Sequence, residues 1–369
     1  MRLNKLIIVP LIIALLSGCA SKPLLTSTSR DVAAVLQPIS KSNIVDSRSE
    51  FRGIYCAVNK DHGAELPDFR DCNIALHKLS DETEISYDYI FLQAFHHKLH
   101  VLILPGIFGE CIKDEISPFS DAAEYLNRYE DIYVEIFPGI RGRASSKHNS
   151  LVIQQYLSNL QKSSNEKLII VAYSKGTTDM LLFLSNDEFA DSYNKIDALV
   201  SIAGVVNGSP LADDLSNTLK KLISIFPYED CPIQDESGLE DLTRSNQLYR
   251  LSKMQLPKNI AYYSLPAYTD YKNTSFILQS SYNKLSQIDP RNDGQVIYFD
   301  SILPRAHLLG YANADHWAVA LPFSRNTDKL NFTNRSIAKL ADKNAYPREV
   351  LLESILRFID IDLSKTSQP

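Results

Sequence analysis

One serine of the chain stands where its neighbours could make it a nucleophile. Ser174 lies within residues 167–183, an apolar run followed by a tight turn and then an amphipathic segment. This order predicts a strand, a sharp turn and a helix, with small residues at Ala172 and Gly176 leaving room for a strained serine backbone. The backbone N–H of Lys175 would then face an oxyanion formed at the serine. We therefore take Ser174 as the candidate nucleophile and Lys175 as one oxyanion donor.

A serine hydroxyl needs a base to take its proton, and that base needs a third group to orient it. Two histidines follow Ser174 in the sequence, His307 and His316. His316 lies in a loop-like stretch near the end of the predicted core and is our candidate base. His307 begins the preceding segment, and we interpret it as a structural or surface histidine.

The orienting acid is expected on a loop after a late strand and before the histidine. Asp293 lies 23 residues before His316, in a polar turn that contains a glycine and leads into apolar residues. It is the first choice, and Asp289 and Asp300 are the alternatives. Asp315 is adjacent to His316 in sequence and therefore poorly placed to accept a hydrogen bond from its Nδ1.

A second oxyanion donor is expected from the loop after the first core strand. Residues 105–109 read Pro-Gly-Ile-Phe-Gly, and their small side chains would let the backbone approach a substrate. We assign the N–H of Ile107 to this role. No metal site is expected, because His96, His97 and His100 have irregular spacing and no accompanying cysteines or carboxylates.

The elements that would position these residues alternate between strand and helix. Apolar runs predict strands at 99–104, 132–137, 167–173, 196–203, 259–265 and 295–299, and helical spacing predicts helices at 121–129, 149–160 and 348–363. Such alternation is typical of an α/β protein with a mostly parallel, doubly wound sheet. Residues 207–257 change to helical pieces after a core strand, which predicts a helical cap or lid insertion.

These motifs together resemble the α/β-hydrolase superfamily, in particular a bacterial lipase- or esterase-like branch. The resemblance covers roughly residues 99–362 and is carried by residues 104–109, the serine turn, 292–296 and 310–322. In lipases the aspartate of such Asn-Asp-Gly segments is the triad acid, which supports Asp293. The resemblance implies hydrolysis of carboxylic esters, acyl or lipid-like, through an acyl-serine intermediate and without a cofactor.

Other functions use the same parts. An amidase, a thioesterase or an acyltransferase would need the same serine, histidine and aspartate. A non-catalytic envelope protein could also keep this fold as a binding or scaffold module, although it would not need all three residues. Reaction with a fluorophosphonate probe would distinguish the scaffold from the enzymes.

The first residues predict an exported, lipid-anchored protein. A basic stretch at 1–5 and a short apolar stretch at 6–16 lead into Leu-Ser-Gly-Cys ending at Cys19, which resembles the lipobox of a bacterial lipoprotein. Because Ala20 is not an aspartate, we expect attachment to the outer membrane, facing the periplasm. Residues 20–50 would form a tether. The net charge of −6 and the absence of basic runs indicate no nucleic-acid partner, and the oligomeric state is left open.

Four further cysteines remain in the exported chain, and they can form two disulfides in three possible connectivities. Cys56 and Cys72 are close in sequence within residues 51–98, a small segment before the hydrolase-like domain at 99–365. We therefore pair Cys56 with Cys72 and Cys111 with Cys231. Free buried thiols are the alternative.

Overall fold

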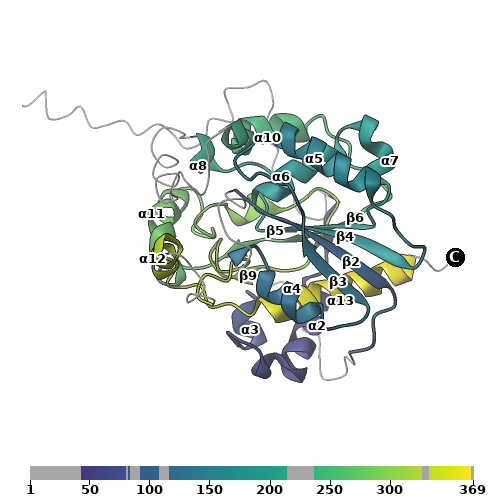
Figure 1. Cartoon of the computed structure of the whole chain (residues 1–369). Helices are drawn as coiled ribbons and strands as arrows, with labels where there is room; N and C mark the ends of the chain where they lie inside the picture. Colours follow the sequence, from purple (N-terminus) through teal and green to yellow (C-terminus); the bar gives the residue numbers. More distant parts are fainter. Residues whose placement is uncertain are drawn as a thin grey trace, which may run out of the picture.

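Seven parallel strands form the central sheet of the residues that the computed structural model describes, which are 43–79, 82–83, 92–107, 116–213, 237–325 and 332–366. Their order across the sheet is β1-β8-β6-β5-β4-β2-β3 (Figure 1). The bounds are β1 Val45–Asp46, β2 Lys98–Leu104, β3 Ile132–Ile136, β4 Glu166–Tyr173, β5 Ala198–Ile202, β6 Ala261–Leu265 and β8 His307–Leu308. The predicted α/β fold with a parallel, doubly wound sheet is confirmed.

Helices cover both faces of this sheet (Figure 1). One face carries α2 Arg48–Asp61, α4 Ser120–Leu126 and α13 Arg348–Thr366, and the other carries α5 Ser146–Asn159, α6 Lys175–Leu184 and α7 Ala190–Tyr193. The other α-helices of the described residues are α3 Cys72–Ala75, α8 Pro210–Asp213, α10 Arg244–Leu251, α11 Phe276–Leu285 and α12 Phe332–Leu340. The helices predicted at 121–129, 149–160 and 348–363 are therefore present with slightly shifted ends.

The pleat of the strands divides the hydrophobic core into two layers. Val101, Ile103, Ile169 and Val171 pack with α2, α4 and α13, whereas the alternate residues of the same strands pack with α5 and α6. Successive strand side chains point to opposite faces, so a strand buried on both faces needs apolar residues throughout. This is why β2 and β4 read as continuous apolar runs.

The strand predicted at 295–299 is not present. Residues Tyr298–Ser301 form a short 3₁₀ helix, and the sheet resumes at β8. The N–H groups of Gln295 and Val296 both donate to the Asp293 carboxylate, at 2.8 and 2.7 Å. The backbone there wraps around a side chain and cannot at the same time pair with a neighbouring strand.

Part of the stretch predicted as a tether forms regular structure. β1 and the first turn of α2 lie within 20–50, the stretch predicted as a tether. Val45 pairs with His307, and Arg48 is buried against Asp46 at 2.7 Å. Residues 1–42, with the predicted signal sequence and Cys19, lie outside the described residues.

A disulfide joins Cys56 of α2 to Cys72 of α3, as the sequence predicts. The partners of the second predicted pair, Cys111 and Cys231, lie outside the described residues. Within the insertion predicted at 207–257, the described residues include α8, a 3₁₀ helix at Ser237–Leu242 and α10. None of the described helices is long and apolar enough to cross a bilayer.

Candidate active site

Ser174 occupies the sharp turn between β4 and α6. Its backbone has φ 54° and ψ −124°, outside the regions that L-residues ordinarily adopt. Neighbouring backbone holds it there: its N–H donates to the Ile202 carbonyl at 3.2 Å, and its carbonyl accepts from Thr177 and Val205 at 3.1 Å each. Strain of this kind persists only where surrounding structure enforces it, and it is concentrated at functional sites.

The structure brings Ser174, His316 and Asp293 together in one chain of short contacts. Nε2 of His316 lies 2.9 Å from the Ser174 Oγ, and Nδ1 of His316 lies 2.7 Å from Asp293 Oδ2. Ser174 and His316 are each 4% exposed, and Asp293 is fully buried. An ionised Asp293 would fix the proton of the imidazole on Nδ1 and leave Nε2 free to accept from the serine hydroxyl.

The turn that carries Asp293 also holds the histidine. Asp293 Oδ1 accepts from two backbone N–H groups, which leaves Oδ2 for His316. The backbone N–H of His316 donates to the Asp293 carbonyl at 2.8 Å, and the Tyr173 hydroxyl donates to the His316 carbonyl at 2.7 Å. The imidazole is therefore fixed through both its ring and its backbone.

The alternative acids lie elsewhere or have other partners. Asp289 pairs with Arg291 at 2.8 Å, and Asp300 pairs with Arg244 at 2.9 Å. Burial raises the pKa of Asp300 to about 7, and the Arg244 guanidinium acts against this shift. Among the described residues, neither Asp289 nor Asp300 forms a hydrogen bond or ion pair with His316.

Asp315 and His307 have structural contacts. The Asp315 carboxylate accepts from the N–H groups of Trp317, Ala318 and Ser275, at 3.1, 2.8 and 2.8 Å, so it holds the loop around His316. Burial raises the pKa of this carboxyl. His307 belongs to β8, and its Nδ1 lies 2.9 Å from the Ser47 Oγ.

Two glycines allow the predicted oxyanion loop to approach the serine. A Cβ on Gly106 would lie 2.8 Å from the Ser174 Cβ and 3.2 Å from its Oγ. A Cβ on Gly176 would lie 2.8 Å from the carbonyl oxygens of Leu104 and Pro105. The backbone of 104–106 therefore lies directly beside the serine turn, and Ile107 follows it.

Sequence reasoning missed the role of the Lys175 side chain. Its ammonium is fully buried and lies 2.7 and 3.0 Å from the two carboxylate oxygens of Asp179, one helical turn later. Asp179 also accepts from Asn149 Nδ2 at 2.7 Å, which connects α6 with the start of α5. The i,i+4 spacing of Lys175 and Asp179 was the available signal.

The three histidines before and within β2 bind carboxylates. Nδ1 of His96 and Nδ1 of His97 lie 2.8 and 2.7 Å from the two oxygens of Asp360, and His100 lies between Glu135 and Glu166. Among the described residues no group of three or more histidines, cysteines or carboxylates could hold a metal ion.

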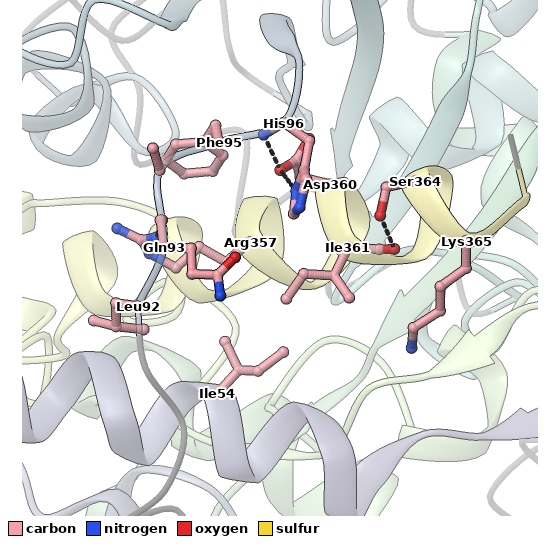
Figure 2. Close-up of a pocket in the computed structure, with 11 residues that line it drawn as sticks. Ile54, Leu92, Gln93, Phe95, His96, Arg357, Asp360, Ile361, Ser364 and Lys365 are labelled. Carbon is pink, nitrogen blue, oxygen red and sulfur yellow. Dashed lines mark hydrogen bonds and ion pairs between the residues drawn. The ribbon is translucent and has the colours of Figure 1, made fainter. Parts of the chain in front are cut away.

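A cavity of about 350 Å³ lies at the end of the sheet where β2 begins, opposite the end that carries Ser174 (Figure 2). Its lining includes Phe95 and His96, just before β2 begins, and Arg357 and Asp360 of α13. The seven residues of β2 separate it from the serine end of the sheet by about 20 Å. Arg357 already donates to Glu353 and to the Gln93 carbonyl, so we do not assign substrate chemistry to this cavity.

The parallel sheet, the strained serine turn and the histidine–aspartate pair are together typical of the α/β-hydrolase superfamily. The chain belongs to this superfamily. A carboxyl esterase from a metagenome is 33% identical, with a TM-score of 0.82, and the match covers 92% of this chain and all of that one. A Bacillus licheniformis lipase is 17% identical over 60% of this chain and 86% of its own, with a TM-score of 0.47. A Pelosinus fermentans lipase is 11% identical over 68% and 99%, with a TM-score of 0.48. The sequence matches no family model and no curated protein.

Proposed function

We propose that this protein is a serine hydrolase that cleaves carboxylic esters through an acyl-serine intermediate. The observation that carries the proposal is the chain of contacts from Ser174 through His316 to Asp293, at 2.9 and 2.7 Å, on a strained strand–helix turn. The 33% identical relative is a carboxyl esterase, which favours an ester over an amide or thioester.

The geometry suggests how each group would act. As the Ser174 Oγ attacks the ester carbonyl carbon, His316 Nε2 would take the hydroxyl proton and then give it to the departing alkoxide. The developing oxyanion would accept hydrogen bonds from the N–H groups of Lys175 and Ile107. In the second half His316 would take a proton from a water as its oxygen attacks the acyl carbon, and it would return this proton to the Ser174 Oγ as the bond between Oγ and the acyl carbon breaks and the acid leaves. Asp293 would set the tautomer of the neutral imidazole and stabilise the imidazolium that forms in each half.

The test is hydrolysis of p-nitrophenyl esters with short and long acyl chains by the chain that lacks residues 1–19. The matched control is the Ser174→Ala variant of the same chain. We expect turnover by the parent and its loss in the variant, and the chain-length profile would show whether the substrates are lipid-like. No reaction of the parent with any ester or with a fluorophosphonate would contradict the proposal and favour the scaffold alternative.

We further propose that the protein is anchored in the bacterial cell envelope through lipid on Cys19. The support is the sequence pattern at 1–19 and the length of the polar stretch that follows it. Several acyl chains would give stable attachment, since one chain alone binds only marginally. Full-length protein should fractionate with outer membranes, and the Cys19→Ser variant should lose acyl labelling and leave that fraction.

A further inference from the structure

The N-terminal segment reaches the loop that carries His316. Residues 72–77, here called the brace, run along β9 Ala312–Asn313, and Leu76 forms an antiparallel bridge with Ala312. The His77 N–H donates to the Tyr311 carbonyl at 2.9 Å, and Asn313 Nδ2 donates to the Ile74 carbonyl at 2.9 Å. Strand β7 Ala267–Tyr268 pairs with the opposite edge of β9. β9 is thus held on both edges.

Two side chains of α2 fix the brace in turn. The Arg52 guanidinium donates to the carbonyls of Leu76 and His77, at 3.2 and 2.7 Å, and it pairs with Glu82. Cys56 is joined by the disulfide to Cys72 at the start of the brace. Arg52 and Cys56 are four residues apart and therefore share one face of the helix. The side chains of Arg52 and Glu82 are 11% and 1% exposed, so solvent screens this ion pair little.

The path from the brace to the reacting atoms is short. β9 ends three residues before His316, and the intervening Asp315 is buried and fully engaged with backbone N–H groups. The His316 N–H is bonded to the Asp293 carbonyl. A shift of β9 along or away from the brace would therefore move the imidazole relative to Ser174. Misplacing a reacting group by about 1 Å can cost on the order of 100-fold in rate.

We propose that Arg52 and the Cys56–Cys72 disulfide position His316 by fixing the brace against β9. Arg52 is then a positioning residue that acts on the reaction through the histidine loop. This inference rests on the proposed serine hydrolase function. It assigns to the N-terminal segment a part in turnover besides its packing on the domain.

The test uses three variants. The first is Arg52→Lys, the second carries both Cys56→Ala and Cys72→Ala, and the third combines all three substitutions. Arg52→Lys keeps a cation opposite Glu82 but loses the planar fork that binds two carbonyls, so it is the variant best suited to remain folded. Glu50→Gln is the control, because Glu50 is also on α2 but forms an exposed pair with Lys365 at 3.0 Å. For each we would measure kcat, KM and the rate of phosphonylation by a fluorophosphonate, well below the melting temperature.

We expect Arg52→Lys to lower kcat and the phosphonylation rate about fivefold and the combined variant about 50-fold, with KM within about twofold of the parent. The number of sites that finally react should stay unchanged, and Glu50→Gln should match the parent. The inference is overturned if rates per reactive site equal those of the parent, or if activity falls only in step with the number of reactive sites. A parent that never reacts with the probe overturns the proposed function, and this inference with it.

Discussion

Substituting Gly106 by alanine should impair turnover far more than stability. The added Cβ would lie 2.8 Å from the Ser174 Cβ and 3.3 Å from the Tyr173 Cδ1, whereas carbon atoms in good contact are about 3.5–4.0 Å apart. The loop must therefore retreat from Ser174 by about 0.7 Å or more. The Ile107 N–H retreats with it.

The expected loss follows from the role proposed for that N–H. Removing one oxyanion donor typically lowers kcat by about 10²–10³-fold, so we expect a loss of about 100-fold with a smaller change in KM. Overpacking of this size destabilises a core by about 1–3 kcal/mol, which a folded domain of this size should tolerate. Steady-state kinetics on a p-nitrophenyl ester gives kcat, and urea denaturation gives the free energy of unfolding.

Gly63→Ala provides the matched control. Its Cβ would lie 2.6 Å from Asn59 Oδ1, at the end of a side chain that can rotate away, near the end of α2 and away from the serine turn. It should leave kcat unchanged. If Gly106→Ala is folded and keeps kcat within about threefold of the parent, the assignment of the second oxyanion donor to this loop is wrong.

Three further outcomes follow from the described contacts. Asp293→Asn should lower kcat about 10⁴-fold while the fold is kept, because an amide no longer enforces the tautomer that leaves Nε2 as acceptor; an unchanged kcat would exclude Asp293 as the orienting acid. Lys175→Met should destabilise the protein by about 3–5 kcal/mol in urea, since it leaves Asp179 buried without its cation, and adding Asp179→Leu should recover much of this. The hydrogen bond to Glu353 raises the pKa of His62 from 6.5 to about 9. The stability that this pair contributes is complete below pH 6.5 and is lost as the pH rises through about 9. The melting temperature of His62→Gln should therefore vary less with pH between 6.5 and 9 than that of the parent.

Where hydrophobic periodicity and local turn chemistry agree, the sequence predicts this structure well. β2, β4 and β5 are mostly buried on both faces and mostly apolar, so these strands can be predicted directly from the sequence. The candidate triad could be chosen because two histidines follow Ser174 and one of them has a loop aspartate at a suitable distance before it.

The predictions that failed depend on contacts that hydrophobic periodicity does not show. Residues 295–299 have the composition of a strand, but two of their N–H groups bind Asp293, so the backbone turns there. β1, Val45–Asp46, has only two residues, too few to show a periodic pattern. It is a strand because it pairs with β8. The partners of Arg52 lie more than 20 residues away in sequence and could not be inferred from composition, since a charged residue in a helix usually faces solvent.

Elements near the N-terminus of the described chain pack against elements near its C-terminus. β1 is the outer strand beside β8, and α2 lies along α13, where the rings of Phe51 and Phe358 are 6.2 Å apart (Figure 1). These contacts join residues 262 and 307 positions apart, and such non-local contacts raise the contact order and slow folding. In a chain that emerges from the ribosome N-terminus first, β1 waits for β8 and α2 waits for α13, which is made last. Cotranslational folding of the whole domain is therefore disfavoured, and truncation before residue 348 should yield an unfolded product rather than a smaller stable domain.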